Sequence, residues 1–186
     1  MSLALNDKQD YEIINGQIYM MSRASLNHNR IAFNINKIFD RHFRNGICES
    51  HIEPDVFLDD KNNFIPDVAV LCDSSKRKPR GIYGAPDLVV EILSPGTEKI
   101  DIADKKDVYG KNGVKEYWTV DPMSKKITVY YLNNNNLELN NIYYYRTSEQ
   151  IEEMPDDDQK AIVSSFRVNL FDDLVINLEE VFEKIH

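Results

Sequence analysis

An apolar segment that carries a single acidic residue, Leu88-Val-Val-Glu-Ile-Leu93, limits the folds open to this chain. Such a run is typical of a central β-strand that is buried on both faces. The alternation of a strand places Glu91 on one face with Val89 and Leu93. A buried, ionised carboxylate is costly unless it is paired or binds a metal ion. Glu91 is therefore a candidate metal ligand, or alternatively a structural acid that pairs with a buried arginine or lysine.

Asp67 has a similar setting in Ile65-Pro-Asp-Val-Ala-Val-Leu71, where it opens a second apolar segment. A proline is tolerated at the start of a strand, where its missing N–H matters least. If the two strands are neighbours, Asp67 and Glu91 converge, and carboxylate oxygens with a backbone carbonyl suit Mg²⁺ or Mn²⁺. Alternatively, an aspartate after proline is only a turn or cap residue. The same dipeptide recurs at Pro54-Asp55, Pro86-Asp87 and Pro155-Asp156.

The segment that follows Glu91 is expected to form a helix with two charged residues on one face. Asp101 and Lys105 are spaced i, i+4, and Tyr109 continues that face. The simplest interpretation is a surface ion pair, which stabilises a helix by only a few tenths of a kcal/mol. The functional interpretation is that the ammonium of Lys105 reaches back towards the carboxylates.

The pattern of apolar residues and turn signals predicts a mixed-sheet α/β sandwich, in one domain over residues 1–186. We expect an N-terminal hairpin around Asn15-Gly16, because this dipeptide favours a tight turn. Helices are expected over 25–44, 97–111 and 178–185, and strands over 48–58, 64–72, 87–93, 116–121 and 161–164. A hairpin over 127–132 and 137–145 is expected to form a C-terminal β extension. Loops are expected over 73–86 and 156–158.

Charge and composition narrow the classes of function. The formal net charge of −9 argues against a protein that coats nucleic acid by bulk electrostatics, but a metal site needs clustered carboxylates. The basic run Lys76, Arg77, Lys78 and Arg80 is interpreted as a solvated loop. No segment is apolar enough to span a bilayer, and the first ten residues show no secretory pattern. Cys48 and Cys72 lack CxxC spacing, so we expect reduced thiols and a cytoplasmic protein.

Several longer segments resemble the PD-(D/E)XK nuclease superfamily, and within it the small bacterial restriction-endonuclease-like family formerly called a domain of unknown function. The similarity extends over nearly the whole chain and is weakest after Leu132. It lies in Tyr11-Glu-Ile-Ile-Asn-Gly, Ile65-Pro-Asp-Val-Ala-Val, Gly84-Ala-Pro-Asp-Leu-Val-Val-Glu-Ile-Leu-Ser-Pro-Gly-Thr, Asp101 to Tyr109 and Gly113-Val-Lys-Glu-Tyr-Trp-Thr-Val-Asp-Pro122.

This resemblance implies a restriction-endonuclease-like fold with Asp67 and Glu91 as the motif acids. Leu93 stands where the motif has lysine, and the resemblance implies that Lys105 takes over that role. It also implies that His28 lies at the edge of the site, although a single histidine is more often structural or exposed to solvent.

The expected function is that of a Mg²⁺- or Mn²⁺-dependent endonuclease that hydrolyses phosphodiester bonds, with DNA as the substrate. Asp67, Glu91 and the carbonyl of Ile92 would hold the metal ion, and Lys105 would complete the site. A homodimer is expected because cutting both strands needs two sites. The alternatives are a catalytically inactive relative that serves as a binding or assembly module, and a glycosidase with two carboxylates.

Overall fold

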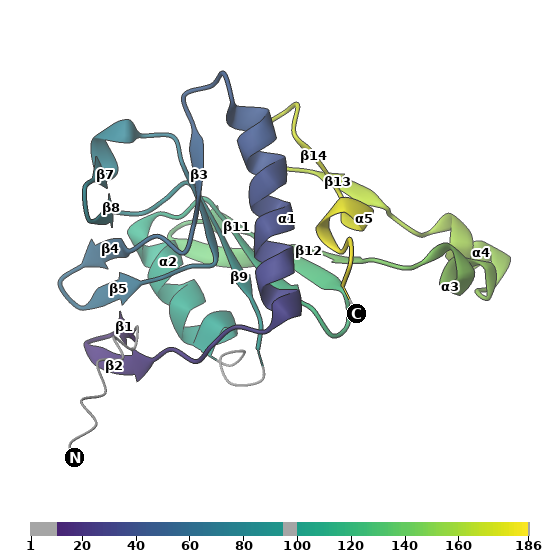
Figure 1. The fold of residues 1–186 in the computed structure, drawn as a ribbon, viewed down its shortest axis with the longest axis horizontal. Helices are drawn as coiled ribbons and strands as arrows, with labels where there is room; N and C mark the ends of the chain where they lie inside the picture. Colours follow the sequence, from purple (N-terminus) through teal and green to yellow (C-terminus); the bar gives the residue numbers. More distant parts are fainter. Residues whose placement is uncertain (1–10, 95–99, 186) are drawn as a thin grey trace, which may run out of the picture.

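A six-stranded mixed sheet runs through the centre of the protein (Figure 1). Glu91 lies on one of its strands, and Asp67 immediately precedes another. The structure is a computed structural model, and it describes residues 11–94 and 100–185, without the side chains of residues 100–102. Strands β9 and β10 are parallel, and the other neighbours are antiparallel. Across the sheet, the strands are β12 (Asn136–Tyr144), β11 (Lys126–Asn133), β10 (Glu116–Asp121), β9 (Leu88–Ile92), β6 (Val68–Leu71) and β3 (Glu49–Ile52).

Apolar side chains pack against both faces of this central sheet. Helix α1 (Leu26–Phe43) covers one face, where its fully buried Ile35 and Phe39 belong to the same core as Val90 of β9. On the other face, Val89 belongs to a core that helix α2 (Lys106–Asn112) and a second sheet complete. Because β6 and β9 are buried at every position, their sequences are continuously apolar rather than alternating. The mixed-sheet α/β architecture expected from the sequence is confirmed.

The second sheet shows that two of the predicted strands are each divided between the two sheets. The segment 48–58 breaks at Glu53, which has a φ of 48°, and at Pro54, so that it forms β3 and β4. The segment 64–72 breaks at Pro66, because proline offers no N–H to a sheet. The second sheet contains, in spatial order, β2 (Gln17–Met20), β1 (Tyr11–Ile14), β5 (Asn62–Phe64), β4 (Val56–Asp59), β8 (Gly81–Tyr83) and β7 (Arg77–Lys78).

The turns and helix ends follow their local sequences in most places. Asn15 and Gly16 have φ values of 52° and 80°, as a tight hairpin turn requires. Ser25 caps α1 by accepting a hydrogen bond from the backbone of His28, and Gly113 ends α2 with a φ of 93°. The expected start of the helix over 97–111 lies outside the described residues. The predicted loop 73–86 was wrong in part, because it contains a short 3-10 helix, η1 (Ser74–Lys76), and strands β7 and β8.

The C-terminal third contains the predicted hairpin, β11–β12, and then a projection away from the body. Helices α3 (Ser148–Glu152) and α4 (Asp156–Lys160) form this projection (Figure 1). The predicted loop over 156–158 is instead the first turn of α4, where acidic side chains favour the helix N-terminus.

After the projection, the chain returns to the body and ends in a small two-stranded sheet and a short helix. The strand predicted over 161–164 lies later in the chain, as β13 (Ser165–Arg167), which pairs with β14 (Val175–Asn177). The last helix, α5 (Leu178–Val181), is shorter than the predicted helix over 178–185. Val181 of α5 is fully buried in the same core as Phe39 of α1, so this end of the chain is fixed to the outer face of the first helix.

The prediction of reduced cysteines was wrong, because Cys48 and Cys72 form a disulfide bond. In the antiparallel pairing of β3 with β6, Glu49 lies opposite Leu71. The next pair outward is Cys48 and Cys72, so the two thiols are directly across from each other, although they are 24 residues apart in sequence. The described helices include none that is long and apolar enough to cross a bilayer.

Candidate active site

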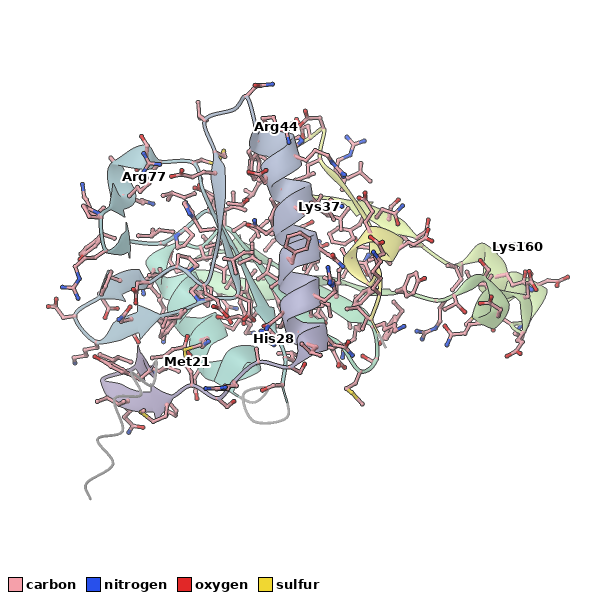
Figure 2. The ribbon with its side chains drawn as sticks, in the orientation of Figure 1. Met21, His28, Lys37, Arg44, Arg77 and Lys160 are labelled. Atoms are coloured by element: carbon pink, nitrogen blue, oxygen red, sulfur yellow. A yellow bond between two sulfur atoms is a disulfide. The ribbon has the colours of Figure 1, made fainter. Side chains whose placement is uncertain are left out.

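Asp67 lies one residue before β6, and its carboxylate has two protein partners. Its Oδ1 lies 2.6 Å from Nε2 of His28, and its Oδ2 accepts a 2.5 Å hydrogen bond from the backbone N–H of Ile92. The pairing of β6 with β9 ends at Val68 opposite Val90. The carboxylate of Asp67 therefore satisfies an N–H of β9 that lies just beyond the paired region. His28 itself is in the first turn of α1, at the lower end of that helix in Figure 2.

Glu91 extends from the opposite strand, β9, into the core beneath helix α2. Its Oε1 accepts hydrogen bonds from Nζ of Lys105, at 3.1 Å, and from the hydroxyl of Tyr109, at 2.9 Å. The residue is only 3% exposed. Continuing the register of β6 and β9 by one pair places Asp67 opposite Glu91, as the sequence analysis required. The two acids thus come from adjacent strands at the same end of the central sheet.

Lys105 and Tyr109 reach Glu91 because a π-helical segment, η2 (Ile100–Lys105), leads directly into α2. Lys105 ends this segment, and Tyr109 follows one α-helical turn later on the same face. Lys105 is only 4% exposed, so its ammonium is not a surface charge. Short π-helical segments are frequent at functional sites.

Tyr109 is fully buried and acts as a hydrogen-bond donor. Its ring packs edge-on against Phe64 at a centroid distance of 5.0 Å. Burial, and after it the nearby charges of Glu91 and Glu12, raises the pKa of the Tyr109 hydroxyl well above its ordinary value. The hydroxyl therefore keeps its proton and holds the carboxylate of Glu91 in place.

Glu12, on β1, is a site residue that the sequence analysis missed. Its Oε1 lies 2.9 Å from Nζ of Lys105 and accepts a 2.8 Å hydrogen bond from the backbone N–H of Ile65. Glu12 is only 7% exposed. A signal was present in the sequence, because the alternation of the hairpin strand places Glu12 on the same inward face as Ile14.

Asp101 is the one predicted site residue whose side chain lies outside the described part of the chain. Its backbone belongs to η2, three residues before the described side chain of Asp104. The proposed pairing of Asp101 with Lys105 stays a prediction. The partners of Lys105 given above, Glu12 and Glu91, come from β1 and β9 rather than from its own helix.

The charge balance of this cluster suits a divalent cation. Glu12 and Glu91 contact Lys105, and Asp67 lies on the strand next to that of Glu91. All three carboxylates are largely buried, and Lys105 is the only buried lysine or arginine among the described residues. No three His, Cys, Asp or Glu side chains of the described part gather closely enough to hold an ion by themselves. Mg²⁺ commonly takes only one or two carboxylates and keeps several waters. The carboxylates of Asp67 and Glu91 and the backbone carbonyl of Ile92 are oxygen donors of the kind that such an ion takes.

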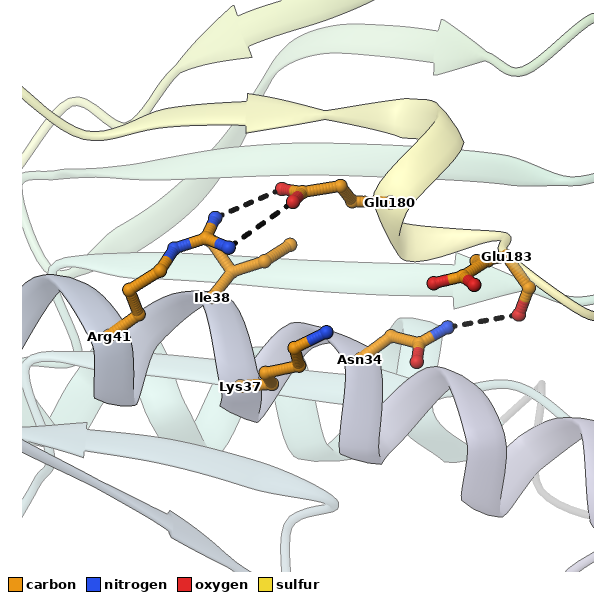
Figure 3. Close-up of a pocket in the computed structure, with 6 residues that line it drawn as sticks. All are labelled: Asn34, Lys37, Ile38, Arg41, Glu180 and Glu183. Carbon is orange, nitrogen blue, oxygen red and sulfur yellow. Dashed lines mark hydrogen bonds and ion pairs between the residues drawn. The ribbon is translucent and has the colours of Figure 1, made fainter.

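A shallow pocket elsewhere on the surface is separate from this cluster. It lies between α1 and α5, where Arg41 donates two hydrogen bonds to the carboxylate of Glu180 (Figure 3). Asn34 donates to the backbone carbonyl of Glu183 at 3.2 Å and so ties the last helix to α1. The lining consists of Asn34, Lys37, Ile38, Arg41, Glu180 and Glu183, none of which was predicted as a site residue.

Comparisons with known proteins support the same assignment of the fold. A protein of Synechocystis sp. named "Uncharacterized protein slr1290" is 35% identical over 130 residues, which is 68% of each chain. A second Synechocystis protein, "Uncharacterized protein sll1609", is 25% identical over 127 residues, covering 64% of this chain and 70% of its own. The solved structure of a "putative nuclease belonging to DUF820" from Anabaena variabilis superposes with a TM-score of 0.71 at 19% identity, and covers 94% of this chain and 90% of that chain.

The family comparison covers most of the chain and includes every residue of the cluster. The model of the family described as "Putative restriction endonuclease" matches residues 1–159. The resemblance to nucleases that the sequence motifs indicated is thereby confirmed, and so is the restriction-endonuclease-like fold. The chain belongs to the family described as "Putative restriction endonuclease".

Proposed function

We propose that the protein hydrolyses phosphodiester bonds of DNA with the help of Mg²⁺ or Mn²⁺. The observation that carries this proposal is the pairing of β6 with β9, which brings Asp67 and Glu91 to the same end of the sheet. The ammonium of Lys105 lies 3.1 Å from Glu91. Two carboxylates can hold the metal ion of such a reaction, and an ammonium can stabilise the negative charge that develops on the phosphate. Membership of a family with a nuclease-like description supports the choice of substrate.

Each residue of the cluster has a role in this proposal. Asp67, Glu91 and the carbonyl of Ile92 would hold the cation, which activates a water and offsets negative charge on the phosphate when it is bound. Lys105 would orient the attacking water or stabilise the charge that develops on the phosphate. His28 and the N–H of Ile92 fix the two oxygens of Asp67. A homodimer would supply one such site to each DNA strand.

The second candidate function is a catalytically inactive binding or assembly module. It is favoured by one observation, which is that Asp67 and Glu91 both already accept hydrogen bonds from protein donors. In an inactive relative, these bonds would serve the fold alone. The net charge of −9 also favours a protein that does not bind nucleic acid over a wide surface.

The test combines cation binding with DNA nicking. Binding of Mn²⁺ is measured by electron paramagnetic resonance or calorimetry, and cleavage is measured on supercoiled plasmid with Mg²⁺ or Mn²⁺. The variants are Asp67→Asn and Glu91→Gln, which keep the shape of the side chain and remove its charge. Glu116→Gln is the matched control, because Glu116 is fully buried in the neighbouring strand β10 but bonds to Trp118 rather than to the cluster.

The proposal expects that the wild type and Glu116→Gln bind Mn²⁺ and nick the plasmid, and that Asp67→Asn and Glu91→Gln do neither. Thermal unfolding of each variant shows whether the fold is kept. Cleavage that survives both substitutions would discredit the site. A wild type that folds but neither binds Mn²⁺ nor nicks the plasmid would favour the binding module. The molecular mass measured by light scattering during size-exclusion chromatography tests the homodimer independently.

A further inference from the structure

Lys105 lies between two buried carboxylates that belong to different parts of the fold. Its Nζ is 2.9 Å from Oε1 of Glu12, on the second sheet, and 3.1 Å from Oε1 of Glu91, on the central sheet. The ammonium is almost completely shielded from water, and so are both carboxylates. Burying a charge is tolerated when it is paired, and removal of one partner leaves a costly unpaired charge. The position of Lys105 therefore depends on both acids.

The carboxylate of Glu12 is fixed independently of Lys105. The same oxygen accepts the backbone N–H of Ile65, at 2.8 Å. Ile65 stands two residues before Asp67, in the segment where the chain passes from β5 of the second sheet to β6 of the central sheet. Glu12 thus joins the helix that carries Lys105 to the segment that carries Asp67.

We propose that Glu12 is a positioning residue, which retains the ammonium of Lys105 when Glu91 turns to a bound cation. This inference rests on the function proposed above. A divalent cation on Glu91 repels the ammonium, so Lys105 stays in the buried site only if another carboxylate balances its charge. Glu12 provides that charge without leaving its backbone partner. Lys105 then remains within reach of the phosphate instead of competing with the cation for Glu91.

In this arrangement, the ammonium of Lys105 and the cation compete for the carboxylate of Glu91. Without the charge of Glu12, the ammonium is attracted more strongly to Glu91 and opposes binding of the cation there. Without Lys105, no ammonium competes with the cation for Glu91, and Glu12 no longer matters to the cation. A residue that itself binds the cation behaves differently, because its loss weakens binding whether or not Lys105 is present.

The experiment is a double-mutant cycle on Mn²⁺ affinity, with Glu12→Gln, Lys105→Met and the double variant, all in the full chain. We expect Glu12→Gln to weaken Mn²⁺ binding about 10–100-fold, the range found when groups that orient metal ligands are removed. Lys105→Met is expected to bind Mn²⁺ at least as tightly as the wild type. In the Lys105→Met background, adding Glu12→Gln is expected to leave the affinity nearly unchanged. Glu116→Gln, which removes a buried glutamate outside the cluster, is the control.

Each other outcome contradicts the inference. Equal weakening in both backgrounds would make Glu12 a metal ligand, and no weakening in either would make it a purely structural acid. If Glu12→Gln does not fold, Glu12→Asp keeps the charge and is expected to retain most of the Mn²⁺ affinity. A wild type that binds no Mn²⁺ overturns both proposals, whereas normal Mn²⁺ binding without coupling overturns this one alone. On plasmid DNA, Glu12→Gln is expected to lower kcat with little change in KM.

Discussion

The hydroxyl of Tyr109 donates to the same oxygen of Glu91 that accepts a hydrogen bond from Lys105. The two donors come from one helical face, and the acceptor comes from the strand beneath it. Two converging donors fix the carboxylate in one rotamer, so Glu91 is oriented before any ligand arrives. Tyr109 contributes this orientation from a position that solvent does not reach.

Replacing Tyr109 with phenylalanine removes only the hydroxyl and leaves the ring packed. Hydrogen bonds to charged groups contribute about 1.5–3 kcal/mol, so we expect the free energy of unfolding to fall by about that amount. Urea denaturation measures the change. Tyr144→Phe is the control, because Tyr144 is 43% exposed, and it should stay within about 0.5 kcal/mol of the wild type. Equal stability of Tyr109→Phe and the wild type would contradict the role given to this hydroxyl.

Replacing His28 with alanine removes the group that lies 2.6 Å from Oδ1 of Asp67. The carboxylate then loses one of the two contacts that orient it, and we expect Mn²⁺ affinity to fall about 10–100-fold. Calorimetric titration with Mn²⁺ measures the change. His51→Ala, on strand β3, serves as the control and should bind Mn²⁺ like the wild type. Unchanged affinity in His28→Ala would show that the histidine belongs to the fold and not to the site.

Glu116 is expected to make stability depend on pH. Burial raises its pKa from 4.5 to about 7, so between these values the folded protein keeps a proton that the unfolded chain releases. Stability therefore falls as pH rises through this window, by up to about 3 kcal/mol, and levels off above it. Glu116→Gln abolishes this contribution. Urea denaturation at several pH values should show the variant gaining stability over the wild type from pH 4.5 to about 7. A constant difference would show that the carboxyl titrates normally.

The disulfide between Cys48 and Cys72 is expected to stabilise the edge of the central sheet. It closes a loop with a sequence separation of 24 residues, and the loss of chain entropy for such a loop corresponds to about 3 kcal/mol. Dithiothreitol should lower the free energy of unfolding by about this amount in the wild type. It should have no effect on a variant that carries Cys48→Ser and Cys72→Ser. Mass spectrometry after alkylation without reductant tests the bond itself, and two alkylated cysteines would contradict it.

The sequence predicted the elements whose signals are local. The Asn15-Gly16 turn, the start of the first helix near Ser25 and the end of the second helix near residue 111 each depend on a few neighbouring residues, and the structure places all three close to where they were expected. Two predicted strands are each divided between the two sheets, at Glu53 and at Pro66. These divisions were not predicted, because residues that favour β-structure continue across both positions. Only the packing of two sheets decides to which sheet each half belongs.

The site residues that could be predicted are those whose burial is visible in the sequence. Asp67 and Glu91 interrupt apolar segments, so their importance can be inferred from single strands. Glu12 lies in a half-exposed hairpin, and its role depends on contact with Lys105, which is 93 positions further along the chain and reaches it only in the folded protein. Likewise, the pairing of Cys48 with Cys72 depends on the register of β3 against β6.

The bond between Asp67 and the backbone of Ile92 has a consequence for the evolution of such sequences. The aspartate completes the strand pairing, so selection for folding alone is enough to retain it. A descendant that had abandoned catalysis would still carry this residue for as long as its sheet had to form. The presence of the aspartate in a relative is consequently evidence of shared architecture and not, by itself, of shared chemistry.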